Sequence, residues 1–154
     1  MTRASTRVSR IIKAPRQAVY RACLDPDALA AWRAPDNMEG RMHAFDPREG
    51  GTYRMSLTYR DRRQSPGGKT SEDTDTFQGR FVELVPDEKI VEAVTFDSSD
   101  PAFAGEMKIT TSLADAGGGT EITILCQDLP PGIRPEDNEM GTRQSLRKLA
   151  VILE

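Results

Sequence analysis

Apolar and polar residues alternate along most of the middle of the chain. The clearest case is residues 53–59, where tyrosine, methionine and leucine occupy every second position and arginine, serine and threonine lie between them. A period of two is typical of a strand with one buried and one exposed face, as in antiparallel sheets. Similar patterns predict further strands over residues 8–12, 38–45, 77–81, 90–96, 107–113 and 122–126.

Two short helices are predicted directly after the first strand. Pro15 stands where a helix can begin, because the first helical position needs no N–H donor. Asp25 is a favourable N-cap and Pro26 a favourable first residue for a second helix. Leu29 and Trp32 lie three residues apart and would share one face of that helix.

The last part of the chain, residues 135–154, changes to helical spacing. Its apolar stripe consists of Leu146, Leu149, Ala150 and Leu153. The order of elements predicts an α+β fold in which helices pack on one face of a strongly bent antiparallel sheet of six or seven strands. The length of 154 residues predicts one domain over residues 1–154, with a flexible tail over residues 1–5.

Composition excludes several classes of protein. The net charge is -3 with acidic and basic residues interspersed, so a nucleic-acid partner is not expected. No window approaches the roughly 18 apolar residues that cross a bilayer, and the first residues lack a signal-peptide core. We therefore expect a cytoplasmic protein without membrane insertion. Cys23 and Cys126 lack partners at metal-ligand spacing, so neither a metal nor a cofactor is expected.

Several motifs occur in a characteristic order. They are Asp46-x-Arg48-x-Gly50-Gly51, the segment 79–91, the segment 141–149 and Trp32-Arg33-Ala34-Pro35. Together with the strand and helix pair of residues 8–32, they resemble the Activator of Hsp90 ATPase homologue 1-like branch (AHSA1) of the START-like superfamily. This superfamily is also called SRPBCC or Bet v 1-like.

The resemblance implies a helix-grip fold, in which the sheet and the long helix enclose an apolar cavity. Relatives in the superfamily include lipid and hormone binders and polyketide cyclases, and the family has no universal catalytic set. Eukaryotic members stimulate Hsp90, an activity that draws on an additional domain. Two positions depart from the family pattern: Thr142 replaces a usual tryptophan, and Arg33 replaces a second one. At Thr142, either neighbours fill the volume of the lost indole or the cavity is larger and more polar, and Arg33 is expected to change the pocket rim.

The inward faces of the predicted strands are rich in methionine and aromatic residues, which suit a pocket for varied apolar ligands. Met38 shares these faces. The candidate ligand-binding residues are Trp32, Met42, Tyr53, Met55, Leu57, Tyr59, Phe81, Glu92, Val94, Phe96, Met107, Ile109, Thr142 and Leu146. The hydroxyl groups of the two tyrosines could orient a ligand. The alternative is that this set forms an ordinary core.

Candidate chemistry centres on Glu92, which shares a face with apolar neighbours. A carboxylate there could be a general acid or base, it could mark a bulge in the strand register, or it could pair with Arg143 or Arg147 on the closing helix. His43, the one histidine, is expected on the exposed face, so the commonest general base is absent from the pocket. No hydrolytic triad is supported, and we assign no catalytic residue.

Three loops carry separate expectations. Asp46 and Arg48 are expected to form a tight turn rather than an anion site, with the following glycines allowing positive φ. The loop 97–105 contains Phe103, which could close over a pocket or anchor the loop. The polar segment 61–75 is expected to be a mobile hairpin tip.

The most favoured function is therefore non-catalytic binding of a small hydrophobic or amphipathic molecule. One alternative is a cavity enzyme of the cyclase or hydrolase type that uses Glu92 or a pocket tyrosine. Another is an Hsp90-activator-like protein-interaction module, with a chaperone as its partner. The exposed Val151 and Ile152 would then form the contact surface, and the same residues could instead form a homodimer.

Overall fold

The computed structural model describes residues 3–60 and 73–154, so most of the polar segment 61–75 lies outside the described residues. In chain order the elements are β1 (Thr6–Ile12), α1 (Arg16–Cys23), α2 (Pro26–Arg33), β2 (Met38–Phe45), β3 (Thr52–Tyr59), β4 (Thr74–Val85), β5 (Lys89–Phe96), the 3-10 helix η2 (Pro101–Phe103), β6 (Met107–Ala116), β7 (Gly119–Gln127) and α3 (Pro135–Leu153). Part of the expected N-terminal tail is also described. There, the carbonyl of Ala4 accepts from the amide of Leu129 at 3.0 Å, so this part is tied to the body.

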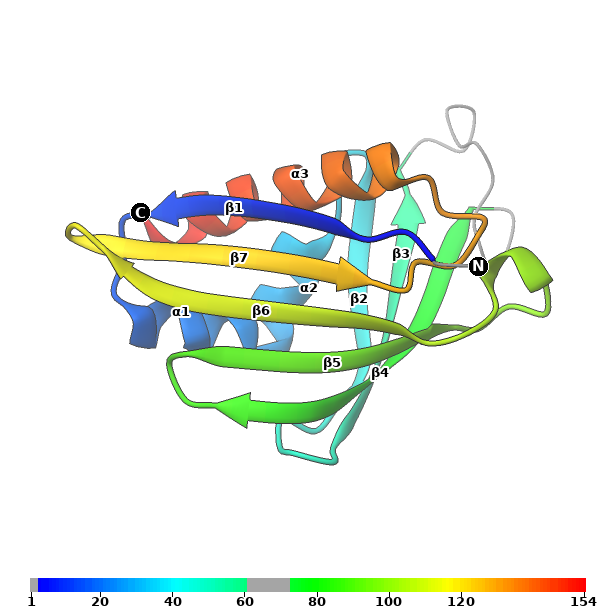
Figure 1. Cartoon of the computed structure of the whole chain (residues 1–154), viewed down its shortest axis with the longest axis horizontal. Coiled ribbons are helices and arrows are strands. Elements are labelled where there is room, and N and C mark those ends of the chain that lie inside the picture. Colours follow the sequence, from blue (N-terminus) through cyan, green and yellow to red (C-terminus); the bar gives the residue numbers. More distant parts are fainter. Residues whose placement is uncertain (1–2, 61–72) are drawn as a thin grey trace.

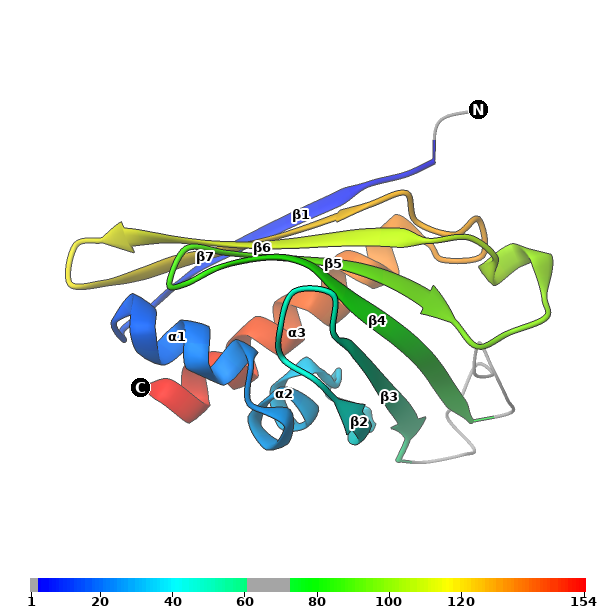
Figure 2. The same cartoon turned by 90° about the horizontal axis from the view of Figure 1, so that it is seen from below.

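The strands form one antiparallel sheet in the order β1-β7-β6-β5-β4-β3-β2. The sheet is strongly bent, and α1, α2 and α3 all lie on its concave side (Figure 2). Because β1 pairs with β7, the first strand closes one edge beside the long helix α3 (Figure 1). The predicted α+β helix-grip fold is therefore confirmed. Within the described residues, no helix is both long and apolar enough to cross a membrane.

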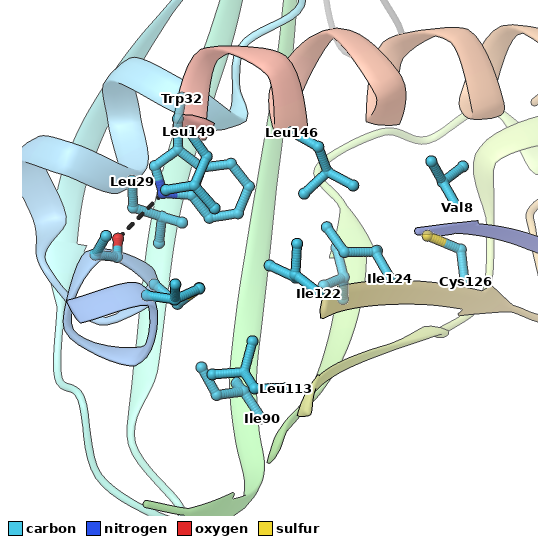
Figure 3. Close-up of a cluster of buried hydrophobic side chains, with 14 of the residues drawn as sticks. Val8, Leu29, Trp32, Ile90, Leu113, Ile122, Ile124, Cys126, Leu146 and Leu149 are labelled. Atoms are coloured by element: carbon cyan, nitrogen blue, oxygen red, sulfur yellow. Dashed lines mark hydrogen bonds between the residues drawn. The ribbon is translucent and has the colours of Figure 1, made fainter. Parts of the chain in front are cut away.

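Local sequence explains where the short helices begin. The carboxylate of Asp25 accepts from the amides of Asp27 and Ala28, and Pro26 occupies the first helical position, as predicted. Trp32 is 1% exposed, and its indole N–H donates to the carbonyl of Ala22 at 3.1 Å. This bond joins the end of α2 to α1 inside the core (Figure 3).

The apolar stripe of α3 lies over β1 and β7. Leu146 and Leu149 are fully buried; Leu146 points toward Ile122 and Ile124, and Leu149 lies beside Leu29 and Trp32 (Figure 3). Full burial of each such side chain contributes about 1.5–3 kcal/mol relative to exposure. The helix is therefore held mainly by packing, as its stripe predicted.

The Asp46–Gly51 motif is a structural turn. Arg48 donates from Nε to Asp46 Oδ2 at 2.8 Å, and Gly50 has a φ of 81°. The amide of Gly50 donates to the carbonyl of Phe81, and the amide of Phe81 donates to the carbonyl of Gly51. The turn is therefore joined to β4 by two backbone hydrogen bonds, which supports a structural role for this motif.

Strand β5 departs from the expected alternation. Residues Ile90–Val94 are all buried, so the outward-facing side chains of the strand are covered as well. Ala93 lies between Arg80 of β4 and Lys108 of β6 in the register, and the long stems of these side chains shield the outer face. The prediction of a wet outer face was wrong for this central strand because its neighbours supply the cover.

Candidate functional site

A half-open pocket of about 940 Å³ lies between the N-terminal half of α3 and the concave face of the sheet. Its wall is mostly apolar and includes Phe77 of β4, Val94 and Phe96 of β5, and Met107 and Ile109 of β6. The opposite wall consists of the start of α3 and the connection from α2 to β2. The end of β3 and the start of β4 contribute to its lining, and there the sheet diverges from the start of α3 (Figure 2).

Eight of the fourteen candidate residues line this pocket: Trp32, Leu57, Tyr59, Val94, Phe96, Met107, Ile109 and Thr142. The other six, Met42, Tyr53, Met55, Phe81, Glu92 and Leu146, belong to the closed core or pack against it. Met38 also lines the pocket. Alternation therefore identified the inward faces, but it did not distinguish open space from filled core along each strand.

Phe103 forms part of the pocket wall and is also anchored. Its ring lies 6.4 Å from that of Phe96, which lies 6.0 Å from the ring of Phe77, measured between centroids. Within η2, the carbonyl of Ala102 accepts from the amide of Gly132 at 2.6 Å. The loop is thus fastened to the segment before α3. The residues of that segment were not among the candidates, since no periodic pattern marks a loop as pocket lining. Phe77 was also omitted, although it lies in a predicted strand and lines the pocket.

A buried polar cluster lies against one end of the pocket. Arg33 donates from Nη1 and Nη2 to the two carboxylate oxygens of Glu92, each at 3.0 Å. Tyr53 donates to Glu92 Oε1 at 2.5 Å and accepts from Arg33 Nη1 at 3.0 Å. The side chain of Arg33 is 14% exposed and that of Glu92 is 3% exposed. We call these three residues the Arg33 cluster.

The Arg33 cluster corrects two expectations. Glu92 pairs with Arg33, not with Arg143 or Arg147 of the closing helix. Those two arginines bind Glu139 and Asp36, respectively, on the surface. Arg33 ends α2 and points into the core rather than lying only at a rim, because α2 approaches the centre of the sheet and a buried carboxylate needs a cationic partner there.

Glycine makes room for this arrangement. Gly79 of β4 is directly opposite Tyr53 of β3, and a Cβ at Gly79 would overlap the tyrosine ring. The ring therefore lies flat over the glycine, and its hydroxyl reaches Glu92 on the next strand. This placement explains why a glycine stands in the middle of an otherwise well-paired strand.

The environment fixes the protonation of the cluster. Burial alone would lower the pKa of Arg33, but the neighbouring charge of Glu92 outweighs it and leaves that pKa above its ordinary value. Burial and the charge of Glu92 raise the pKa of Tyr53 well above its ordinary value. The guanidinium therefore stays charged, and the phenol stays protonated as a hydrogen-bond donor.

The wall segment between α2 and β2 is fastened to α3. Ser145 donates from its hydroxyl to the carbonyl of Arg33 at 2.8 Å, and Lys148 donates to the carbonyl of Ala34 at 2.8 Å. Partial burial lowers the pKa of Lys148, while nearby Asp36 counteracts this effect. These bonds hold the backbone that carries Arg33 at a fixed distance from the helix.

Polar groups also lie near the start of α3. Thr6 donates to Asn138 Oδ1 at 2.5 Å, and Thr142 donates to the Asn138 carbonyl at 2.8 Å. Burial, together with the charges of Asp75 and Asp137, raises the pKa of Tyr59. Thr142 lines the pocket with a small side chain, whereas a tryptophan at this position would occupy far more space.

His43 and Cys23 lie away from the pocket, whereas Cys126 lines it. His43 is exposed on the outer face, as expected, and lies 2.7 Å from the hydroxyl of Ser56. Cys23 and Cys126 are both buried and free, and burial raises the pKa of each thiol. No group of three or more metal-ligating side chains occurs within residues 3–60 and 73–154.

Comparison of the chain with known proteins identifies a matching family. The model of the family described as Activator of Hsp90 ATPase homolog 1-like protein matches residues 13–154. A crystal structure of a protein from Chromobacterium violaceum is similar, with 34% identity, a TM-score of 0.86, and coverage of 97% of this chain and 96% of that one. No curated protein matches the chain.

More distant structures share the fold. A solution structure from Arthrobacter aurescens has 16% identity and a TM-score of 0.79, with 97% of this chain and 85% of that chain covered. A crystal structure from Mycobacterium smegmatis has 13% identity and a TM-score of 0.76, with 97% and 90% covered. The chain therefore belongs to the Activator of Hsp90 ATPase homolog 1-like family, within the START-like superfamily of helix-grip proteins.

Proposed function

We propose that this protein binds a small apolar or amphipathic molecule in the pocket beneath the N-terminal half of α3. The observation that carries the proposal is the pocket itself, a half-open space of about 940 Å³ with a mostly apolar wall. Ligand sites in proteins are typically concave, mostly apolar and roughly 300–1,000 Å³ in volume, with a few polar groups that orient the ligand. Arg33, Tyr59 and Asn138 are such groups here.

The Arg33 cluster favours binding without catalysis. A general acid or base must come within hydrogen-bond reach of the reacting atoms. Both oxygens of Glu92 accept from Arg33, one also accepts from Tyr53, and neither Glu92 nor Tyr53 lines the pocket. A ligand in the pocket would contact Arg33 instead, so Tyr59 is the one residue named by the enzyme alternative that would touch a substrate.

The first experiment is native mass spectrometry of the protein purified from cells, followed by denaturing extraction of any bound molecule. A thermal-shift panel of lipids, sterols and polyketides complements it. We expect a stoichiometric small molecule, or a rise in Tm with members of the panel, because a ligand that binds the folded state stabilises it by mass action.

A matched pair of variants locates the binding. Thr142→Trp places an indole in the pocket wall and should abolish the ligand-dependent rise in Tm by filling the space. Arg143→Trp adds the same indole at the next position of α3, where the side chain is 63% exposed, and should leave binding unchanged. Equal binding by both variants would contradict the proposed location.

Bare protein that gains no stability across the panel would overturn the proposal. The protein-interaction alternative would then be favoured, with Val151 and Ile152 as the first surface to test, since they are 75% and 47% exposed. The name of the family makes a chaperone the partner to examine under that outcome. Chemical conversion of an extracted ligand by the purified protein would instead favour the cyclase or hydrolase alternative.

A further inference from the structure

Arg33 has donors that the protein does not use. A guanidinium carries five N–H groups and no acceptor. Its hydrogen bonds to Glu92 and Tyr53 use no more than three of them, and no described residue accepts from Nε or from the second hydrogen of Nη2. Arg33 also lines the pocket and keeps 14% of its side chain exposed. The remaining donors are therefore accessible from the pocket.

We propose that the ligand carries an uncharged hydrogen-bond acceptor, such as a ketone or another carbonyl, which binds these donors of Arg33. This inference rests on the proposed function and names the chemical class of its ligand. The acceptor is required because an arginine can only donate. A pure hydrocarbon would displace water from Arg33 and leave buried donors unsatisfied, which opposes its binding.

The surrounding charges argue against an anionic ligand. The charge of Arg33 is already balanced by Glu92 directly behind it. Among the described residues of the pocket wall, the other charged groups are Asp36, Asp75, Asp137 and Arg134, and this arginine is already paired with Glu136. A ligand carboxylate would enter this field without a cation of its own, whereas a carbonyl requires only the N–H dipoles.

The Arg33 cluster also prepares the donors for binding. Glu92 holds the guanidinium plane through two bonds, and Tyr53 holds Nη1 through a third. The Arg33 guanidinium carbon lies 5.7 Å from the centre of the Trp32 ring, so the apolar wall begins beside the donors. A ligand with one carbonyl and adjacent aromatic or apolar groups fits this arrangement, because little side-chain entropy remains to be lost on binding.

The test uses three probes that share a shape. Benzophenone carries a carbonyl between two rings, diphenylmethane replaces that carbonyl with a methylene group, and the para-carboxylate of benzophenone adds a negative charge. We expect the unmodified protein to bind benzophenone at least about tenfold more tightly than diphenylmethane, because a hydrogen bond to a charged donor is stronger than a neutral one. The carboxylate derivative should bind more weakly than benzophenone.

A variant and a spectroscopic signature identify the donor. Arg33→Met combined with Glu92→Gln removes the donors without stranding a buried charge, and it should bring the two neutral probes to within about threefold of each other. The carbonyl stretch of bound benzophenone should lie at lower frequency in the unmodified protein than in this double variant. The stretch in the unmodified protein can also be compared with that in an apolar solvent, so a folding defect of the variant cannot obscure the result.

The outcomes separate this inference from the proposed function. Equal affinity for benzophenone and diphenylmethane, or a carbonyl stretch unchanged from that in an apolar solvent, would overturn the role of Arg33 while leaving an apolar pocket in place. Tighter binding of the carboxylate than of benzophenone would also overturn it, in favour of an anionic ligand. Absence of binding by all three probes, up to about 1 mM, together with bare protein that gains no stability across the lipid, sterol and polyketide panel, would overturn both proposals.

Discussion

Replacement of Arg33 by methionine should strongly destabilise the protein. At the 3.0 Å separation seen in the structure, the attraction between guanidinium and carboxylate is about 5 kcal/mol at an effective dielectric constant of about 20. The cost of removing both charges from water is of similar size, so the pair as a whole contributes little net stability. The variant loses the attraction but keeps the buried carboxylate. We expect a loss of about 3–5 kcal/mol in the free energy of unfolding.

Urea denaturation at neutral pH, followed by circular dichroism, measures this loss. For a domain of this size it corresponds to a fall in Tm of about 6–20 °C. The double variant Arg33→Met and Glu92→Gln should recover much of the stability, because no charge is then stranded and the glutamine oxygen can still accept from Tyr53.

Two results would refute this reasoning. A loss below about 1 kcal/mol in the single variant would mean that water from the pocket replaces the guanidinium, and that Glu92 is not effectively buried. A double variant less stable than Arg33→Met would mean that the stabilisation comes from packing around the arginine stem rather than from charge. Arg143→Met, at a position 63% exposed, is the control and should change stability by less than about 0.5 kcal/mol.

Two further predictions concern stability. Gly79→Ala should cost about 1–3 kcal/mol in urea denaturation, because the new methyl group overlaps the Tyr53 ring, whereas Gly141→Ala in α3 should stabilise by about 0.5–1 kcal/mol; equal effects would contradict the overlap. Burial raises the pKa of the Cys23 thiol from 9.0 to about 12, so its contribution is complete below pH 9 and is lost as the pH rises toward 12. Between pH 9 and 12, the free energy of unfolding of Cys23→Ala should therefore fall by roughly 4 kcal/mol less than that of the unmodified protein. An equal fall in the two proteins would contradict the raised pKa of Cys23.

The fold was largely predictable because its signals are local. Alternation identified the strands, Asp25 and Pro26 marked the start of α2, and the stripe through Leu146 and Leu149 identified the packed face of α3. Each signal depends only on the side-chain period of an element and on the unpaired backbone groups at its ends. The exception was β5, since cover for its outer face comes from side chains on neighbouring strands.

The candidate site was predictable only in part. Alternation identifies the side of a strand that faces inward, and on that basis both Tyr53 and Tyr59 were candidates. Their surroundings differ, because Tyr53 lies over Gly79 in the closed core and Tyr59 lies where the sheet has curled away from α3. Curvature of the sheet and its distance from the helix arise from the packing of all the elements, so no single strand encodes them.

The local pattern of the chain was sufficient for the order of the elements, the faces they bury and the glycine turn at Asp46–Gly51. The partner of Glu92, the unused donors of Arg33 and the division between pocket and core depend on segments far apart in the chain. Glu92 and Arg33 are separated by 59 residues and meet only after β5 enters the sheet and α2 folds beneath it. Period and capping act over a few neighbouring residues, whereas pairing of a buried charge depends on the three-dimensional position of every group around it.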